Sequence, residues 1–224
     1  MVIYGSMARR KKKKARPFWL IAVCAALLAA VYLSGRSRQV EPIYPELVNG
    51  IPVYTDLVPS KTPGRPGEKR EIRYLVIHET DNEAESADAK NHNDYLHQIA
   101  QQEPLSWHYT VDDHEIYHHI PDDEIAFHAG DRRQKDGGNM NGIGIELCVN
   151  AGSDYEKTLD NAAKLAAYLL NAYNLELDAV KKHQDFSGKN CPSRLLERGR
   201  WEEFLTKVDT YLSETEGLER KENE

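Results

Sequence analysis

Apolar residues along the chain form two patterns that are typical of buried strands. The run EIRYLVIH at 71–78 is almost uninterrupted in apolar character, as in a central strand that is covered on both faces. The segment IGIELCV at 143–149 alternates, so that its isoleucines, leucine and valine share one face. Glu146 therefore points away from the apolar face of this second strand.

Other segments predict helices and a hairpin around these strands. A polar-surfaced helix is expected over 86–102, and WHYTVDD and EIYHHI, within 107–120, are typical of a hairpin. Ser153 and Glu156 fit a capping box at the start of a long amphipathic helix, and a second apolar stripe begins at Trp201. Together these elements predict an α/β fold with a central mixed β-sheet flanked by helices.

The charge of the chain changes sharply after its first 40 residues. The formal net charge is -7, but those residues carry nine basic side chains and no acid, which leaves 20 basic against 36 acidic residues, or -16, for the rest. A body this acidic would repel a phosphate backbone, so nucleic-acid binding is disfavoured as the function. The nine basic residues are Arg9, Arg10, Lys11, Lys12, Lys13, Lys14, Arg16, Arg36 and Arg38.

Seven of these basic residues, from Arg9 to Arg16, come before a run of sixteen uncharged residues at 18–33, FWLIAVCAALLAAVYL. This length is at the short limit of a membrane-spanning helix and also fits the apolar region of a secretory signal. Basic residues before the segment would keep the amino end in the cytoplasm and export everything that follows. We favour an uncleaved anchor, which predicts a single-pass protein of the cell membrane with an extracytoplasmic body. Cleavage would instead secrete it, and a buried core helix is the remaining alternative.

The composition divides the chain into five segments. A basic cytoplasmic segment is expected at 1–17, the transmembrane anchor or signal at 18–33, and an extracytoplasmic stalk at 34–70. The stalk is rich in proline but keeps several aliphatic residues, so part of it is expected to lie against the domain as an extended strip. The catalytic or binding domain is expected at 71–213, and a charged tail that frays at 214–224.

Residues that could bind a metal or take part in catalysis lie where predicted buried strands and helices end. All nine histidines lie between 78 and 183, and His78 and His183 stand at the ends of such elements. With Cys191 they would supply the three nitrogen and sulfur ligands of a catalytic zinc, which keeps one position open for water. Spacing alone leaves an alternative, because export would also allow a disulfide between Cys148 and Cys191.

An ordered set of motifs between Gly64 and Phe204 resembles a known family. The motifs are GRPG, YLVIHET, SWHYTVDDHEIYHHIP, AFHAGD, GIGIELCVN and HQDFSGKNCP. In this order they resemble the zinc-dependent N-acetylmuramoyl-L-alanine amidases, which share their fold with phage-type lytic amidases and peptidoglycan-recognition proteins. The resemblance implies a peptidoglycan hydrolase, an autolysin type of enzyme that cleaves the bond between N-acetylmuramic acid and L-alanine. It also implies peptidoglycan as the substrate partner and Zn²⁺ as the cofactor.

The resemblance also implies a role for individual residues. Zinc would activate a water molecule, Glu146 would take the proton of that water, and Lys189 would help to stabilise the oxyanion. His128 would line the substrate groove. Two alternatives remain, a non-catalytic peptidoglycan-binding module of the same fold and a membrane-tethered structural protein closed by the disulfide. The residues that the resemblance assigns to zinc are His78, His183 and Cys191.

Overall fold

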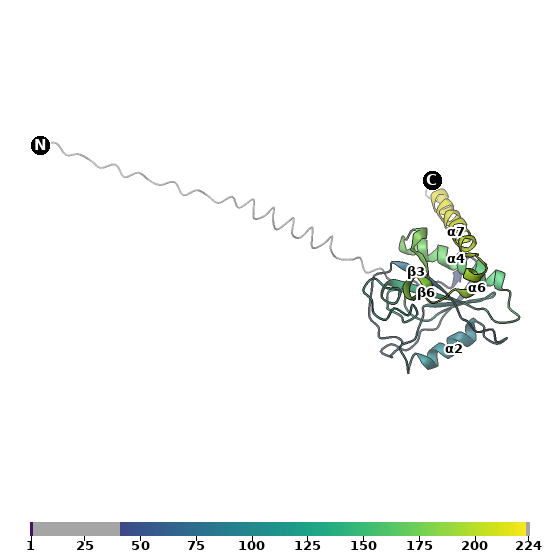
Figure 1. The fold of residues 1–224 in the computed structure, drawn as a ribbon. Helices are drawn as coiled ribbons and strands as arrows, with labels where there is room; N and C mark the ends of the chain where they lie inside the picture. Colours follow the sequence, from purple (N-terminus) through teal and green to yellow (C-terminus); the bar gives the residue numbers. More distant parts are fainter. Residues whose placement is uncertain (2–40, 223–224) are drawn as a thin grey trace. The chain divides into compact units, whose positions relative to one another are not determined.

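The computed structural model describes Met1 and residues 41–222, with side chains up to Thr215. From Glu41 onward these residues belong to one compact unit built on a seven-stranded sheet with strand order β1-β2-β5-β4-β6-β3-β7 (Figure 1). The strands are β1 (Leu47–Val48), β2 (Ile51–Thr55), β3 (Tyr74–Glu79), β4 (Tyr109–Val111), β5 (Ile116–His118), β6 (Gly142–Leu147) and β7 (Val180–Lys182).

The sheet is mixed, as the sequence predicts. Strand β3 pairs in parallel with β6 on one side and with β7 on the other, while β4 pairs in parallel with β6 and antiparallel with β5. In the β3–β6 register His78 lies opposite Glu146. Because neighbouring parallel strands present paired residues on the same face, this register brings an imidazole and a carboxyl group together at the carboxyl end of the sheet.

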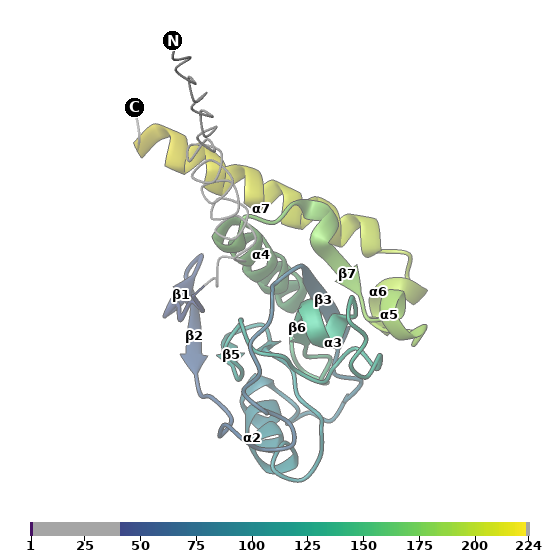
Figure 2. The same ribbon diagram turned by 90° about the vertical axis from the view of Figure 1, so that its left-hand side faces the viewer.

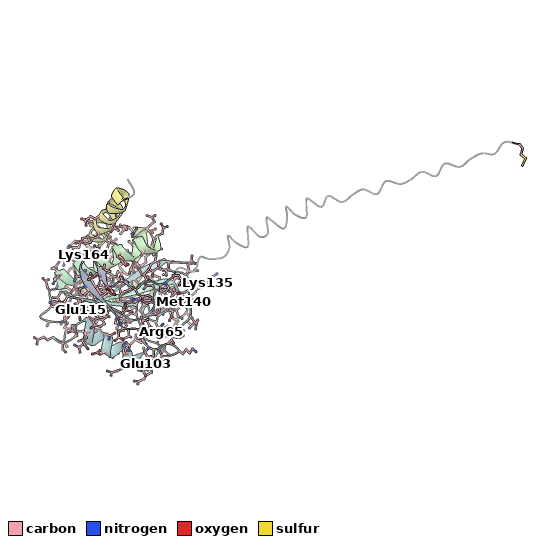
Figure 3. The ribbon with its side chains drawn as sticks, turned by 180° about the vertical axis from the view of Figure 1, so that it is seen from behind. Arg65, Glu103, Glu115, Lys135, Met140 and Lys164 are labelled. Atoms are coloured by element: carbon pink, nitrogen blue, oxygen red, sulfur yellow. The ribbon has the colours of Figure 1, made fainter. Side chains whose placement is uncertain are left out.

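Helices cover both faces of the sheet. On one face lie α4 (Tyr155–Tyr173) and α7 (Trp201–Glu222), and on the other lies α2 (Ala89–Ile99) (Figures 1 and 2). From behind, Lys164 of α4 and Glu103, just after α2, mark these opposite sides (Figure 3). The shorter elements are α3 (Gly138–Asn141), the 3-10 helix η1 (Leu177–Ala179), α5 (Gln184–Ser187) and α6 (Ser193–Glu197).

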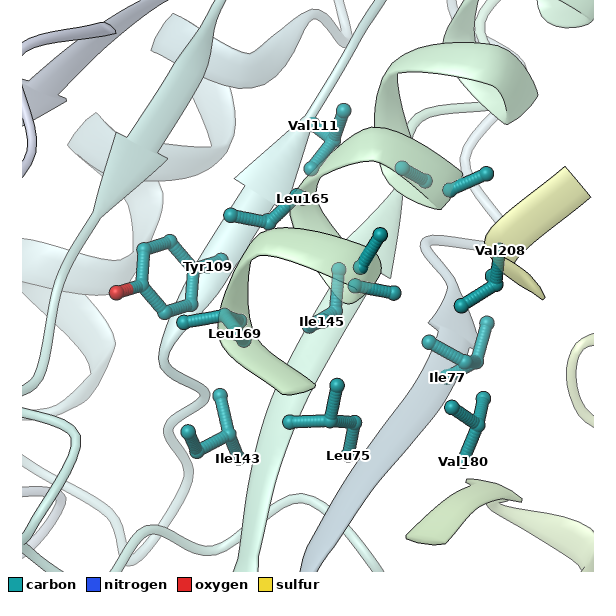
Figure 4. Packing of buried hydrophobic residues seen from close by; sticks show 14 of the residues in the cluster. Leu75, Ile77, Tyr109, Val111, Ile143, Ile145, Leu165, Leu169, Val180 and Val208 are labelled. Carbon is teal, nitrogen blue, oxygen red and sulfur yellow. The ribbon is translucent and has the colours of Figure 1, made fainter. Parts of the chain in front are cut away.

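The main core lies between the sheet and α4. The stripe of leucines and alanines along α4 packs on the apolar faces of β3, β4 and β6, where Leu165 and Leu169 contact the layer that holds Ile145 (Figure 4). All three side chains are fully buried. This packing confirms that the apolar face of β6 turns towards α4 and leaves Glu146 on the opposite face, towards the site.

The expected boundary between stalk and domain at Glu71 is wrong. Strand β1 pairs with β2, and β2 pairs in parallel with β5, so residues 47–55 extend the sheet itself. Val48, Ile51 and Val53 are buried in the main core. These three aliphatic residues of the presumed stalk are therefore core residues, and a short strand pair separates the hairpin strand β5 from solvent.

Two expectations about helix ends also need correction. The amino end of α4 is capped by Asp154, whose side chain accepts a hydrogen bond from the Lys157 backbone N–H, while Glu156 forms an ion pair with Arg200. The predicted capping box is therefore not formed. At the carboxyl end of the chain α7 continues to Glu222, so the charged segment expected to fray from 214 is helical up to that residue.

No helix among residues 41–222 is long and apolar enough to cross a membrane. The segment at 18–33, for which the sequence predicts a membrane anchor or signal, lies outside the residues that the structure describes.

Candidate metal centre and active site

Three side chains that are far apart in the sequence meet at the carboxyl end of β3. His78 is near the end of β3, His183 follows β7, and Cys191 lies in the turn before α6. The His78 and His183 Nδ1 atoms are 3.0 Å apart, and the Cys191 Sγ is 3.9 Å from the His78 Nδ1. One ligand atom of each residue lies within 4.8 Å of the others, and all three residues are buried. The structure thus brings together the three predicted ligands.

Hydrogen bonds on the far sides of the two rings determine which nitrogens are free. The His128 Nε2 lies 3.3 Å from the Gly142 carbonyl oxygen and donates to it, so the neutral His128 ring accepts at Nδ1. That Nδ1 is 3.0 Å from the His78 Nε2, which therefore carries a proton. The His183 ring is likewise hydrogen bonded to the Ala129 backbone. Both Nδ1 lone pairs consequently face each other across 3.0 Å.

Two lone pairs at this distance repel unless a proton or a cation lies between them. The electrostatic setting disfavours the proton, because burial holds the pKa of His78 well below its ordinary value. Burial, assisted by the Lys189 charge, lowers the pKa of His183 to about 4. Neutral imidazoles are the form in which histidine binds metals. The donor set of two nitrogens and one sulfur fits a divalent cation of borderline softness such as zinc.

Cys191 is a free thiol in this structure, as is the buried Cys148. The disulfide that would have made the chain a stapled structural protein is therefore not present. Burial raises the pKa of the Cys191 thiol to about 12, with a hydrogen bond from the Glu79 backbone N–H among the opposing effects. A thiol with a pKa this high stays protonated near neutral pH, so it becomes a ligand only when a cation displaces its proton.

Glu146 faces the same cluster from the neighbouring strand. Its Oε1 is 3.9 Å from the His78 Nδ1, and its Oε2 is buried without a hydrogen-bond partner. Burial raises the pKa of this carboxyl group to about 8, and the Lys189 charge opposes that rise. A carboxyl group with a pKa near neutrality and a free oxygen can both accept and return a proton, which suits a general base and acid.

Lys189 lies close enough to Glu146, His78 and His183 for its charge to affect their pKa values. Its Nζ is 3.2 Å from a carboxylate oxygen of Asp81, and its side chain is 54% exposed. The cation therefore stands at the rim of the site, held by an acid that the sequence analysis did not single out. From this position it can turn towards a developing negative charge.

His128, for which the sequence predicts substrate contact, lies against the His78 ring, with its Nδ1 3.0 Å from the His78 Nε2. It is buried, and its backbone N–H donates to the Asn139 side chain. Burial lowers the pKa of its ring to about 3. Gly144 of β6 makes room for the ring, because a Cβ at that position would lie 2.7 Å from the His128 Cγ. The placement argues for a role in orienting His78.

A groove leads away from Glu146 along α2. Its inner part, a pocket of about 190 Å³, is lined by Thr80, His92, Tyr95, Leu105, Trp107 and Glu146. Thr80, His92 and Tyr95 also line an adjoining pocket of about 350 Å³ that extends towards the amino end of α2. The Thr80 Oγ1 and the His92 Nε2 are buried and have no hydrogen-bond partner. Unsatisfied polar atoms beside the Glu146 carboxyl group are suited to binding a polar ligand.

These groove residues were not predicted from the sequence, which indicated only a polar-surfaced helix over 86–102. In the structure His92 is 9% exposed and Tyr95 is 48% exposed. Their spacing of three residues on a helix, which puts them on one face, was a usable signal. So was the position of Thr80 directly after the strand that carries His78.

A second group of metal-ligating side chains, Asp112, Asp113 and His114, has a structural explanation. The Asp112 carboxylate accepts hydrogen bonds from the backbone N–H groups of Ala89, His114 and Glu115. Asp113 accepts one from the Asp154 backbone N–H. These acids thus satisfy backbone donors at a turn and at helix ends.

Comparison with known proteins agrees with this geometry. Residues 68–194 match the model of the N-acetylmuramoyl-L-alanine amidase family. The chain is 39% identical over 160 residues to the N-acetylmuramoyl-L-alanine amidase CwlH of Bacillus subtilis, covering 71% of this chain and 62% of that protein. It is 40% identical over 163 residues to the amidase XlyA of the same organism, covering 73% of this chain and 53% of that protein.

The fold is also similar to solved structures. The catalytic domain of XlyA superposes with a TM-score of 0.66 at 39% identity, covering 70% of this chain and 99% of that domain. The structure of PlyL superposes with a TM-score of 0.64 at 31% identity, covering 70% of this chain and 97% of that one. This chain therefore shares a catalytic domain with its relatives but spans only 62% and 53% of the two curated amidases.

Proposed function

Because the chain belongs to the N-acetylmuramoyl-L-alanine amidase family, we propose that it hydrolyses the amide bond between N-acetylmuramic acid and L-alanine in peptidoglycan. The observation that carries the proposal is the meeting of His78, His183 and Cys191 beside the free carboxyl oxygen of Glu146. A non-catalytic binding module would need the groove but not this combination of ligands and a general base.

The proposed cofactor is one zinc ion. The His78 and His183 Nδ1 atoms and the Cys191 sulfur would hold it, since these donors are close together and have free lone pairs once the thiol proton is lost. When bound, zinc supplies Lewis acidity, which makes water a nucleophile near neutral pH and polarises a carbonyl group. Displacing the thiol proton makes binding pH-dependent, and it weakens as the solution becomes more acidic.

Glu146 would move the proton in the reaction. Its unpartnered Oε2 is available to take a proton from the attacking water and to return it to the amide nitrogen as the bond breaks. The nearby cation of Lys189 and a bound divalent ion would both favour the ionised form of Glu146, which is the form that acts as base. One carboxyl group would thus serve both halves of the hydrolysis.

Lys189 would stabilise the negative charge that develops on the carbonyl oxygen. Its ammonium group now pairs with Asp81 at the rim, where both side chains are about half exposed. A preorganised cation beside a developing oxyanion contributes more in a closed, substrate-filled site than in open water. Substrate that covers the rim would therefore strengthen this interaction.

The groove along α2 would hold the part of the muropeptide next to the scissile bond. Among the residues that line its two pockets, Glu146 is the only acidic one and there is no lysine or arginine. The others offer hydroxyl, amide, imidazole, aromatic and small aliphatic groups. Such a lining fits the hydroxyl and amide groups of a sugar and peptide backbone. The unpartnered atoms of Thr80 and His92 would then find partners in the substrate.

Digestion of muropeptides by the purified chain, followed by mass analysis, tests the proposal. With one equivalent of zinc the chain should release stem peptides that begin with free L-alanine, and a chelator should stop the reaction. Binding of peptidoglycan without cleavage in the presence of zinc would support the non-catalytic module instead. Cleavage between two amino acids or between two sugars would refute the amidase assignment.

We propose in addition that residues 18–33 anchor the enzyme in the cell membrane, with the domain on the extracytoplasmic side. The support is the apolar composition of this segment and the basic residues before it. Membrane fractions of expressing cells should contain the full-length chain, and a protease added outside should remove the domain. Recovery of a shortened chain from the medium would show that the leader is cleaved.

A further inference from the structure

Glu79 stands next to His78 in the chain but turns to the opposite face of the strand, and its side chain is directed towards the Cys191 segment. It is 2% exposed. Its Oε2 accepts hydrogen bonds from the Arg194 backbone N–H at 2.6 Å and from the Ser193 Oγ at 3.2 Å. Its Oε1 accepts a hydrogen bond from the Tyr155 hydroxyl. A fully engaged buried carboxyl group thus links β3 to the first residues of α6 and α4.

The contact with α6 acts as a helix cap supplied by a distant residue. The residue that precedes α6, Pro192, makes no side-chain capping bond, so the first backbone N–H groups of this helix depend on outside acceptors. Glu79 provides one, and a carboxylate also suits the positive end of a helix. Because Cys191 comes immediately before Pro192, the position of α6 determines where the sulfur lies.

A second link on the other side of Cys191 completes the attachment. Asp81, just after β3, accepts a hydrogen bond from the Ser193 Oγ and forms the ion pair with Lys189. Lys189 comes two residues before Cys191 and Ser193 two residues after it, so both sides of the cysteine are attached to this segment. The Asp81 and Lys189 side chains are about half exposed, whereas the Glu79 contacts are buried. Screening by water weakens the exposed pair, and Glu79 is left as the stronger attachment.

We propose that Glu79 is a positioning residue for the metal centre, which fixes Cys191 against His78 by capping α6 and thereby sets the affinity for the divalent ion. The inference rests on the proposed binding of zinc by His78, His183 and Cys191. It concerns a residue that need not contact metal or substrate, and it explains why an acid is buried behind the site. Residues that orient metal ligands typically alter metal affinity by about 10- to 100-fold when they are changed.

Metal affinity and cobalt spectra of the full-length chain test this role. We compare Glu79→Ala, which removes all three hydrogen bonds, with Glu79→Gln, whose oxygen can accept from the Arg194 N–H while its amide donates to the Tyr155 hydroxyl. Glu83→Ala is the matched control, because Glu83 binds the Arg194 guanidinium 2.7 Å away without capping the helix. Zinc affinity is measured by competition with a chromogenic chelator, and Co²⁺ reports cysteine ligation through its sulfur-to-metal charge-transfer band.

Glu79→Ala should bind zinc about 10- to 100-fold more weakly and should lose intensity in the cobalt–sulfur band. Glu79→Gln should stay within about threefold of the wild type, and Glu83→Ala should be unchanged. A folded Glu79→Ala protein with wild-type affinity and an intact band would overturn the inference. Absence of zinc binding by the wild type would instead refute the proposed metal centre, so the two failures are distinguishable.

If Glu79→Ala does not fold, Ser193→Ala tests the same positioning role. It removes the hydroxyl that donates to both Glu79 and Asp81 and leaves the core untouched. A decrease in zinc affinity of about two- to tenfold, with a weaker cobalt–sulfur band, would support the inference. Unchanged affinity and an unchanged band in this variant would count against it.

Discussion

At the scale of single residues, the site is built from groups whose surroundings keep them neutral until a cation arrives. The His78 and His183 rings are held in the tautomer that directs a lone pair inward, and the Cys191 thiol is buried. Glu146 retains one oxygen with no partner. The structure thus gathers lone pairs and a carboxyl oxygen that have no partner within the protein. A divalent ion and a substrate together can supply those partners.

Replacing Glu146 by glutamine separates proton transfer from metal binding. Glu146→Gln keeps the size of the side chain but removes the base, so we expect zinc content to be unchanged and kcat to fall by at least about 10²-fold. Metal analysis and muropeptide digestion of the same sample measure both quantities. Loss of zinc from this variant would mean that Glu146 holds the ion and does not act as the base.

A methyl group at Gly144 should disturb the metal centre through His128. The added Cβ would lie 2.7 Å from the His128 ring, which must then move and weaken its hydrogen bond to His78. We expect Gly144→Ala to bind zinc about 10-fold more weakly. Chelator competition measures the change, and unaltered affinity in a folded Gly144→Ala protein would exclude His128 as an orienting residue.

At the scale of elements, the strongest patterns were predicted correctly. The alternation along β6 predicted that Glu146 points away from the apolar face, and the structure confirms this. The position of Glu146 opposite His78 comes from the pairing of β6 with β3. Strands β1 and β2, two and five residues long, were assigned to a stalk because the segment around them is rich in proline. Their membership in the sheet depends on pairing with β5, a contact between distant segments that local composition cannot reveal.

Substitutions in this strand pair measure how far β1 and β2 belong to the domain. Ile51 is 7% exposed and packs in the main core, whereas Leu47 on the partner strand is 61% exposed. We expect Ile51→Ala to lower the free energy of unfolding by about 2–5 kcal/mol and Leu47→Ala to change it by less than about 0.5 kcal/mol. Urea unfolding followed by circular dichroism gives both values. Equal effects of the two substitutions would restore the stalk interpretation.

At the scale of the whole molecule, the sequence predicted the candidate site residues better than the residues that surround and position them. His78, His183, Cys191 and Glu146 were singled out because few residue types can bind a metal or transfer a proton, and the structure brings them together. The groove residues, the Asp81 partner of Lys189 and the cap from Glu79 have no such restriction, since their roles arise only from packing. Burial of so many ionisable groups also makes the stability of the whole domain sensitive to pH.

The metal-free chain should be most stable near pH 6.5 as far as these buried groups are concerned. Burial lowers the pKa of His128 to about 3 and of His183 to about 4, so only the unfolded chain binds their protons between about pH 6.5 and pH 4. Acidification through this range should therefore reduce the free energy of unfolding by up to about 1.4 kcal/mol per pH unit for each histidine.

Glu146 acts in the opposite direction. Its pKa is raised to about 8 in the folded chain, so folding favours its protonated form, and that contribution is lost as the pH rises from about 4.5 to 8. Above pH 6.5 only Glu146 of these groups changes the free energy of unfolding, which falls as the pH rises. Below pH 6.5 the loss from the two histidines on acidification exceeds the gain from Glu146. Urea titrations with a chelator at several pH values test the curve. A steady gain in stability from pH 7 to pH 4 would contradict it.

The sheet that begins at Leu47 also limits where a tethered enzyme could work. If residues 18–33 are the anchor, residues 34–42 would connect it to the domain, because Ile43 already packs against the core and its backbone N–H donates to the Tyr173 hydroxyl. Nine residues at full extension reach no farther than about 30 Å. A stalk that continued to residue 70 would have reached about four times as far. The enzyme would then act only on substrate within that distance of the membrane surface.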